Sequence, residues 1–347
     1  MSKATRSRSS GAPDRPAGHS LARARTRFGA ALLALAAIVL AHPAWGGTIR
    51  VGVLKFGTVS WELDVIERNG LDQAAGVEVE VVELATNNAT AVALQAGAVD
   101  VIVTDWLWVT HQRADGAGYS FVPYSTSIGA LVVPASSPIR GLADLDGKRL
   151  GIAGGPVDKS WLLFRALATQ RHGLDLDAAV DKVFGAPPLL NEQIALGEID
   201  AVINNWNFVA QLEAKGYRRV MGAEEVAKAL GVSTDVPMLG YVFDESWAEA
   251  NRDDVLAFVE ASRAAKALLA RSDAEWEKLR PLMRAPDEAT FLALRDGFRR
   301  GIPQSWGDAQ RADAARLFEI MAELGGPELV GQSDELQPGT FWPKVTY

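Results

Sequence analysis

The sequence of 347 residues contains no cysteine and only four histidines. Disulfide bonds, thiolate metal sites and a cysteine nucleophile are therefore excluded. Beyond residue 46 only His111 and His172 remain, and neither has the spacing of a zinc motif such as HExxH. GxSxG, GxGxxG and P-loop patterns are missing, and no isolated carboxylate pair falls at clustered strand ends as an acid/base couple would. We therefore expect a protein that is not an enzyme and holds no metal or cofactor.

Clustered positive charge is missing beyond the first residues of the chain. Residues 1–27 contain seven basic side chains, residues 28–41 are apolar, and Ala44 and Gly46 suit the small positions before a signal peptidase cut. The apolar run of 14 residues is shorter than the roughly 20 residues that span a membrane. We expect residues 1–46 to be a cleaved signal peptide rather than an anchor, so the mature protein is exported to the periplasm without membrane insertion.

The remaining chain is strongly acidic. Without residues 1–46 it has 28 basic and 42 acidic residues, a formal net charge of −14. Such a charge disfavours nucleic acid and anionic lipid as partners. We expect a small-molecule ligand and a monomeric protein.

Residues 48–106 and 149–206 show the same order of predicted elements. Runs typical of strands occur at 48–57, 77–85, 99–106, 148–155, 181–186 and 199–206. Helical patterns lie between them, and Trp106 and Trp206 end the third run of each series. Alternation of helices with continuous apolar strands predicts parallel sheets with right-handed crossovers. We therefore expect an α/β fold with two similar lobes.

Two further strand-like segments, within 121–148 and at 236–243, would connect the lobes as hinge strands beside a cleft. Helical patterns follow at 246–271, 273–283, 286–300 and 308–324 and are expected to pack on lobe one, with an extended tail from Pro327. The predicted division is a signal peptide (1–46), the first part of lobe one (47–127), lobe two (128–238) and a return to lobe one (239–347).

The residues that follow each strand are the candidates for ligand contact, because ligands of open parallel sheets bind beyond the carboxyl ends of the strands. Small and hydroxyl residues at helix starts leave backbone N–H groups free for a polar head, and indoles supply apolar walls. The predicted ligand-binding residues are Gly57, Thr58, Trp61, Thr86, Asn87, Asn88, Asp105, Trp106, Ser125, Gly155, Pro156, Trp161, Asn205, Trp206 and Tyr241.

A structural role is the alternative for several of these residues. The tryptophans could belong to the lobe cores, Thr86 to Asn88 could only cap a helix, and Asp105 could cap the helix that follows it. Asp105 could also pair with a cation. Lys159 lies near the presumed cleft and could meet an anion or remain solvated. Both interpretations stay open at the level of sequence.

Three segments resemble the periplasmic solute-binding proteins of ABC importers. They are GTVSWELDVIERNGLD (57–72), LQAGAVDVIVTDW (94–106) and PASSPIRGLADLDGKRLGIAGG (134–155). The resemblance is greatest to the branch that includes taurine-, nitrate-, sulfonate- and thiamine-precursor binders. It covers most of residues 48–245.

The resemblance implies a type II periplasmic binding protein fold whose lobes close on a ligand by hinge bending. It also implies a membrane permease with its ATPase as partner, and it places contact loops at Gly57 to Trp61, Thr86 to Asn88, Asp105-Trp106, Gly155-Pro156 and Asn205-Trp206. No arginine occurs in these loops, so the expected ligand is an organic solute such as a sulfonate, amine, pyrimidine or aromatic acid. An enzyme on this fold and a ligand-presenting sensory protein are the alternatives.

Overall fold

The computed structural model describes residues 46–55, 57–333 and 335–347. The predicted signal peptide therefore lies outside the described residues, apart from Gly46. Within these ranges, no helix combines the length and the apolar character that crossing a bilayer requires.

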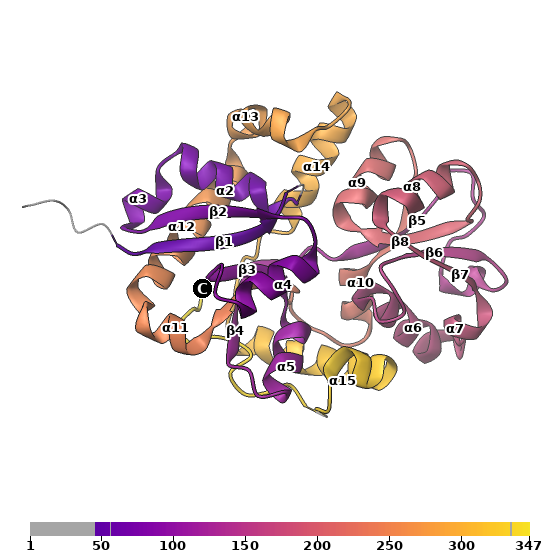
Figure 1. Ribbon diagram of the computed structural model, residues 1–347. Helices are drawn as coiled ribbons and strands as arrows, with labels where there is room; N and C mark the ends of the chain where they lie inside the picture. Colours follow the sequence, from indigo (N-terminus) through magenta and orange to yellow (C-terminus); the bar gives the residue numbers. More distant parts are fainter. Residues whose placement is uncertain (1–45, 56, 334) are drawn as a thin grey trace, which may run out of the picture. The chain divides into compact units, whose positions relative to one another are not determined.

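The first sheet contains five strands: β1 (Thr48–Leu54), β2 (Glu78–Leu84), β3 (Val101–Asp105), β4 (Tyr119–Ser125) and β10 (Leu239–Asp244). Their order is β2-β1-β3-β10-β4. Strands β1, β2 and β3 run parallel, and β10 is antiparallel to both of its neighbours. We call this sheet with its helices lobe one (Figure 1).

The second sheet also contains five strands: β5 (Gly129–Val133), β6 (Arg149–Ala153), β7 (Asp181–Gly185), β8 (Ala201–Asn205) and β9 (Arg218–Gly222). Their order is β7-β6-β8-β5-β9. Strands β6, β7 and β8 run parallel, and β5 is antiparallel to β8 and β9. We call this sheet with its helices lobe two.

The two sheets share one topology, which confirms the prediction of two similar lobes. In each sheet the fourth place is taken by an antiparallel strand that follows a crossing from the other lobe, β10 in lobe one and β5 in lobe two. The turn before the third strand is also repeated. Asp100 accepts a hydrogen bond from the backbone N–H of Arg50 at 2.8 Å, and Asp200 accepts one from Arg149 at 2.8 Å. Strand β9 and the helix after it were not predicted.

The helices of the lobes alternate with the strands. In lobe one they are α2 (Val59–Arg68), α3 (Leu71–Ala75), α4 (Asn87–Gln95) and α5 (Trp106–Ala114). In lobe two they are η1 (Leu142–Leu145), α6 (Lys159–His172), α7 (Leu176–Ala179), α8 (Pro187–Ala195), α9 (Trp206–Ala214) and α10 (Ala223–Ala229). Side chains cap four of their N-termini: Thr86 caps α4, Asp105 caps α5, Asp158 caps α6 and Asp175 caps α7.

The C-terminal helices are α11 (Glu245–Ala250), α12 (Arg252–Arg271), α13 (Asp273–Met283), α14 (Glu288–Arg300) and α15 (Asp308–Val330). As expected, α12 packs on α2 and α3, and α13 packs on α2. The last two helices differ from the expectation, because α14 packs on α9 of lobe two and α15 packs on both α5 and α6. Both helices therefore join the lobes.

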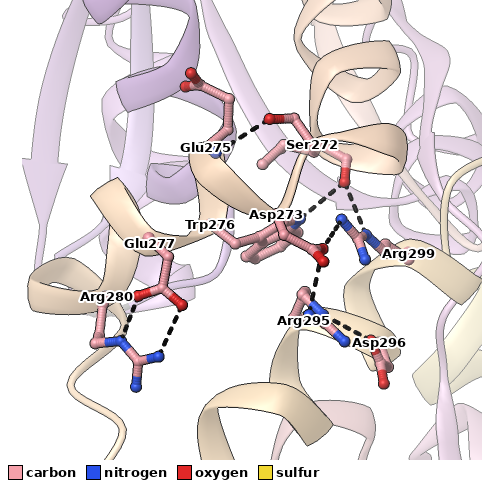
Figure 2. A network of polar contacts seen from close by, with 10 residues as sticks. Ser272, Asp273, Glu275, Trp276, Glu277, Arg280, Arg295, Asp296 and Arg299 are labelled. Carbon is pink, nitrogen blue, oxygen red and sulfur yellow. Dashed lines mark hydrogen bonds and ion pairs between the residues drawn. The ribbon is translucent and has the colours of Figure 1, made fainter.

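A polar network holds α14 against the start of α13 (Figure 2). The carboxylate of Asp273 pairs with Arg299 at 2.7 Å and with Arg295 at 3.2 Å. Arg299 also donates to the carbonyl of Leu269 at 2.9 Å, as the buried indole of Trp276 does at 2.8 Å. These contacts fix the helix that faces lobe two.

The tail begins later than expected, because α15 continues past Pro327 to Val330. The described residues after it form turns rather than an extended segment, and part of them is buried. The backbone N–H of Phe121 in β4 donates to Thr340, and the N–H of Trp342 donates to Phe121. The indole of Trp342 has no exposed surface and packs on Phe243. The tail therefore contributes to the core of lobe one rather than only covering its surface.

Candidate functional site

The lobes meet through an ion pair at the N-termini of α5 and α6. Asp105 lies at the end of β3 in lobe one, and Lys159 begins α6 in lobe two, with 2.9 Å between Oδ2 and Nζ. The other carboxylate oxygen of Asp105 accepts from the N–H of Trp108 at 2.9 Å. Asp105 therefore acts both as a helix cap and as the partner of a cation, and that cation is a side chain of this protein.

The charged groups around this contact shift one another's pKa values. The negative charge of Asp105 raises the pKa of Lys159 above 10.5, despite partial burial. Burial raises the pKa of the neighbouring Asp158 carboxyl, and the N–H of Trp161 opposes that effect. Because the pKa of Lys159 is raised on folding, the stabilisation it provides is fully present below pH 10.5 and is lost as pH rises through the folded value.

We expect the Lys159→Met variant to populate an open arrangement of the lobes more than the wild-type protein does. A partly exposed ion pair contributes up to about 1 kcal/mol, so the closed-to-open ratio should fall about fivefold. The radius of gyration from small-angle scattering should increase accordingly. Lys182→Met is the matched control, because Lys182 pairs with Asp177 within lobe two. An equal radius for both variants would contradict this role of Lys159.

A second contact between the lobes is aromatic. Trp206, the first residue of α9, packs edge-on against Trp61 of α2 with ring centroids 6.2 Å apart. It also contacts Phe298 of α14 at 6.4 Å. Gly297 allows this approach, since a Cβ there would lie 2.9 Å from the Trp206 ring. Trp61 is 6% exposed, whereas Trp206 is half-buried and lines a pocket described below.

Trp106 and Trp161 differ from the expectation that they line a cleft. Both side chains are completely buried and belong to one hydrophobic core. That core includes Phe318 of α15, which packs on both lobes, and Phe341 of the tail contacts Trp106 at 6.1 Å. The indole N–H groups of the two tryptophans have no hydrogen-bond partner among the described residues. Helix α15 and the tail, which lie far along the chain, therefore cover side chains that their position after a strand would leave exposed.

Tyr241 was also predicted to contact ligand, and it is instead part of a buried network in lobe one. Its hydroxyl donates to Oε1 of Glu62 at 2.9 Å. Ser262 donates to the same oxygen, and Lys266 Nζ donates to Oε2 at 2.5 Å. Burial lowers the pKa of Lys266, an effect that the charge of Glu62 partly offsets. The network occupies the interior between α2, β10 and α12.

The other predicted contact residues keep some exposed surface. Thr86, Asn87, Asn88, Pro156 and Asn205 are exposed, and Gly57, Thr58, Ser125 and Gly155 are half-buried. Thr58 and Ser125 line a small void of about 10 Å³ together with Trp206. Asp105 retains 16% of its side-chain surface. For these residues ligand contact stays a prediction.

A pocket of about 310 Å³ lies where the two crossings meet lobe two. Thr126 to Gly129 form one wall just before β5, Trp206 follows β8, and Glu224 follows β9. Gly129 pairs with Asn205, and Ala130 pairs with Gly222. The pocket is therefore at the carboxyl edge of the lobe-two sheet, where open α/β sheets bind ligands. Residues from the end of α14 close its other side.

Two arginines line this pocket, although the predicted loops contain none. Arg219 in β9 is neutralised by Glu213 at 2.9 Å and by Glu224 at 3.3 Å. Arg300, in the last turn of α14, is exposed and pairs with no carboxylate within the described residues. The sequence had no local signal for either residue, because both come from elements outside the strand-to-helix loops. The pocket thus offers one uncompensated guanidinium beside an indole and several hydroxyls.

The described part of the chain contains no group of three or more His, Asp or Glu residues that could hold a metal ion. The two carboxyl groups beside Lys159, those of Asp105 and Asp158, each cap a helix.

The fold has clear relatives among solved structures. The alkanesulfonate-binding protein of Xanthomonas axonopodis pv. citri bound to MOPS is 19% identical, with a TM-score of 0.64 over 87% of this chain and 99% of that one. The periplasmic aliphatic sulphonate-binding protein of Escherichia coli is 18% identical, with a TM-score of 0.68 over 86% and 93%. A desulfurization enzyme is 15% identical, with a TM-score of 0.52 over 80% and 92%. At these identities the likeness concerns the fold.

Comparison at the level of sequence gives one match, to a family profile. No curated protein matches the chain significantly. The sequence profile of one family matches residues 67–274, which include most of lobe one's first part, all of lobe two and helix α12. With two lobes of shared topology and a profile match over more than half of its length, the chain belongs to the NMT1/THI5-like family.

Proposed function

We propose that this protein is the substrate-binding subunit of an ABC importer. It captures a small organic solute between its lobes and delivers it to a membrane permease that an ATPase drives. It works in the periplasm as a monomer, after export by its N-terminal signal peptide. No catalytic step is part of this function.

The observation that carries the proposal is the pocket at the carboxyl edge of lobe two. Its volume of about 310 Å³ lies at the lower end of the range for small-molecule sites, about 300–1,000 Å³. Arg300 supplies a charge, Thr126 and Ser127 supply hydroxyls, and Trp206 supplies an apolar wall. This combination suits an organic molecule with an anionic head and a short apolar part.

The relatives support the same class of function. Two of them are named as alkanesulfonate- or aliphatic sulphonate-binding proteins, and the second is named as periplasmic. Another is named as the ligand-binding component of an ABC-type import system of Staphylococcus aureus. Beside the pocket the lobes meet through the ion pair of Asp105 with Lys159 and the aromatic pair of Trp206 with Trp61.

The proposal is tested by ligand screening of the mature protein. Thermal-shift measurements against sulfonates, amines, pyrimidines and aromatic acids should reveal saturable stabilisation by at least one solute with an anionic group, since a ligand of the folded state raises its stability. If no member of the panel stabilises the protein, the proposed function is wrong. Mass spectrometry of the compound that co-purifies with the protein identifies the natural solute.

The Arg300→Gln variant should bind an anionic solute from this panel at least tenfold more weakly, which corresponds to about 1.4 kcal/mol. Its thermal stability should not change, because the guanidinium is exposed and unpaired. Titration calorimetry on both proteins measures the difference. Arg271→Gln is the control, since Arg271 is an exposed residue at the end of α12 outside the pocket. Equal affinities for the two variants would show that Arg300 does not contact the solute.

The desulfurization enzyme among the relatives makes a direct test of catalysis worthwhile. Incubation of the mature protein with its solute should return that solute unchanged, and any turnover would overturn the non-catalytic assignment. Transport is separated from ligand sensing by uptake into vesicles that contain a candidate ABC permease with its ATPase. Uptake that does not depend on the protein would argue for the sensory alternative.

A further inference from the structure

A small void lies beside the pocket, at the junction of the two lobes. Its volume of about 10 Å³ suffices for one water-sized group. Tyr124, Ser125 and Lys266 line it from lobe one, and Trp206 lines it from lobe two. Trp206 and Ile302 line both the void and the larger pocket. Separation of the lobes would therefore open the void to a solute in that pocket.

The void contains a buried hydroxyl without a hydrogen bond. Tyr124 is 3% exposed, and its Oη has no hydrogen-bond partner among the described residues. Thr58, which also lines the void, lies beside this hydroxyl but not in the geometry of a hydrogen bond. Burial raises the pKa of Tyr124 well above 10, so the hydroxyl keeps its proton at neutral pH. Buried polar groups are nearly always paired, so this one points to a missing partner.

The other polar groups of the void can also donate. Lys266 Nζ uses two of its three hydrogens, one to Glu62 at 2.5 Å and one to Ser262 at 2.8 Å. Its ammonium lies 4.4 Å from the centre of the Tyr124 ring. Thr58 and Ser125 each add a hydroxyl. The site is thus rich in donors and requires an acceptor.

The charge of the site restricts what kind of acceptor fits. Glu62 is completely buried and already neutralises Lys266. A second anion beside this pair would be buried without a countercharge, which is costly. A neutral oxygen acceptor brings no such charge and can take the protons of Tyr124 and Lys266.

We propose that the void beneath Trp206 is a subsite for a neutral oxygen of the solute, a hydroxyl, carbonyl or amide group, held by Tyr124 and Lys266. This subsite rests on the proposed function, because the solute reaches it from the pocket that contains Arg300. The solute then carries an anionic head at one end and a neutral oxygen at the other. The subsite favours such molecules over analogues that lack the oxygen or replace it with a second anion.

Matched solutes test the subsite. The probes are alkanesulfonates of two to four carbons in three forms, with a terminal hydroxyl, with a terminal methyl and with a terminal carboxylate. Titration calorimetry on the wild-type protein should show that one hydroxyl form binds at least tenfold more tightly than its methyl and carboxylate counterparts. In the Tyr124→Phe variant this preference should become several-fold smaller, because Lys266 is then the main remaining donor.

The thermal stability of the variants separates this role from a structural one. Tyr124→Phe should not lower the melting temperature, because the lost hydroxyl has no partner. Tyr241→Phe is the matched control: it removes a hydrogen bond to Glu62, so it should lower the melting temperature and keep the preference for the hydroxyl form. A preference that is absent from the wild type, or that is undiminished in Tyr124→Phe, overturns the subsite.

Ligand screening with the same panel of solutes distinguishes failure of the subsite from failure of the proposed function. If a panel member binds and the probes show no preference dependent on Tyr124, the subsite is wrong and the proposed function stands. If no panel member and no probe binds, the proposed function fails and the subsite fails with it.

Discussion

The Trp106→Ala and Trp206→Ala variants should have opposite effects, although the two residues occupy matching places in the lobes. Trp106→Ala should lower the free energy of unfolding by about 3–5 kcal/mol, because it empties a completely buried volume that α15 and the tail enclose. The affinity of the folded variant for its solute should be unchanged. Denaturant titration and calorimetry measure the two quantities separately.

Trp206→Ala should instead weaken solute binding by at least tenfold, about 1.4 kcal/mol. The ring lines both the pocket and the void, and it contacts Trp61 across the lobes. Its truncation removes a wall of the site and one closing contact. The loss of stability should be smaller than for Trp106→Ala, because Trp206 is only half-buried.

Phenylalanine replacements provide the matched controls. Trp106→Phe keeps an aromatic ring and removes an indole N–H that has no partner among the described residues, so it should cost less stability than Trp106→Ala. Trp206→Phe should retain more affinity than Trp206→Ala. A Trp106→Ala protein of normal stability with reduced affinity would instead place Trp106 at the ligand.

The Glu62→Gln variant should lose about 3–5 kcal/mol of stability at neutral pH. The carboxylate of Glu62 is completely buried and is the charged partner of Lys266, so its removal leaves a buried ammonium without a countercharge. Replacement of both residues by methionine should recover most of this loss, since it removes both charges together. Guanidinium titration of the single and double variants measures the effect. A single variant as stable as the wild type would contradict the ion pair.

The stability of Glu62→Gln should also depend on pH in a defined direction. Burial lowers the pKa of Lys266 below its ordinary value of 10.5 even in the wild type, and loss of Glu62 removes the charge that opposes this shift. The folded variant then binds fewer protons than the unfolded chain between the folded pKa and pH 10.5. Its stability should therefore rise with pH in that window, by at most about 1.4 kcal/mol per pH unit. A flat profile would show that Lys266 is not buried as a charged group.

The two-lobed fold was predictable because its signals are local and repeated. Continuous apolar strands alternate with helical patterns, and the series occurs twice with Trp106 and Trp206 in register. The parallel strands of both sheets follow that pattern. Strand β9 was not predicted, because Arg218 and Arg219 interrupt the apolar run that would indicate a strand. Its place in the sheet depends on its pairing with β5.

The candidate site was only partly predictable. Position after a strand predicted that Asp105 would cap a helix or meet a cation, and the structure shows both, with Lys159 as the cation. Position could not predict that Trp106 would be covered by α15, or that Arg300 would reach the pocket from the end of α14. These relations depend on packing between residues far apart in the chain.

The sequence by itself determined the class of fold, the internal repeat, the acidic charge and the lack of cysteine chemistry, because composition and periodicity carry this information directly. Only the tertiary structure decided which of the matching tryptophans is accessible and where an unpaired charge and an unpaired hydroxyl lie. The reason is that α14 and α15 pack on both lobes. Trp106 and Trp206 occupy equivalent ends of two similar sheets. Because of these helix contacts, Trp106 lies in a buried core, whereas Trp206 forms part of a pocket wall.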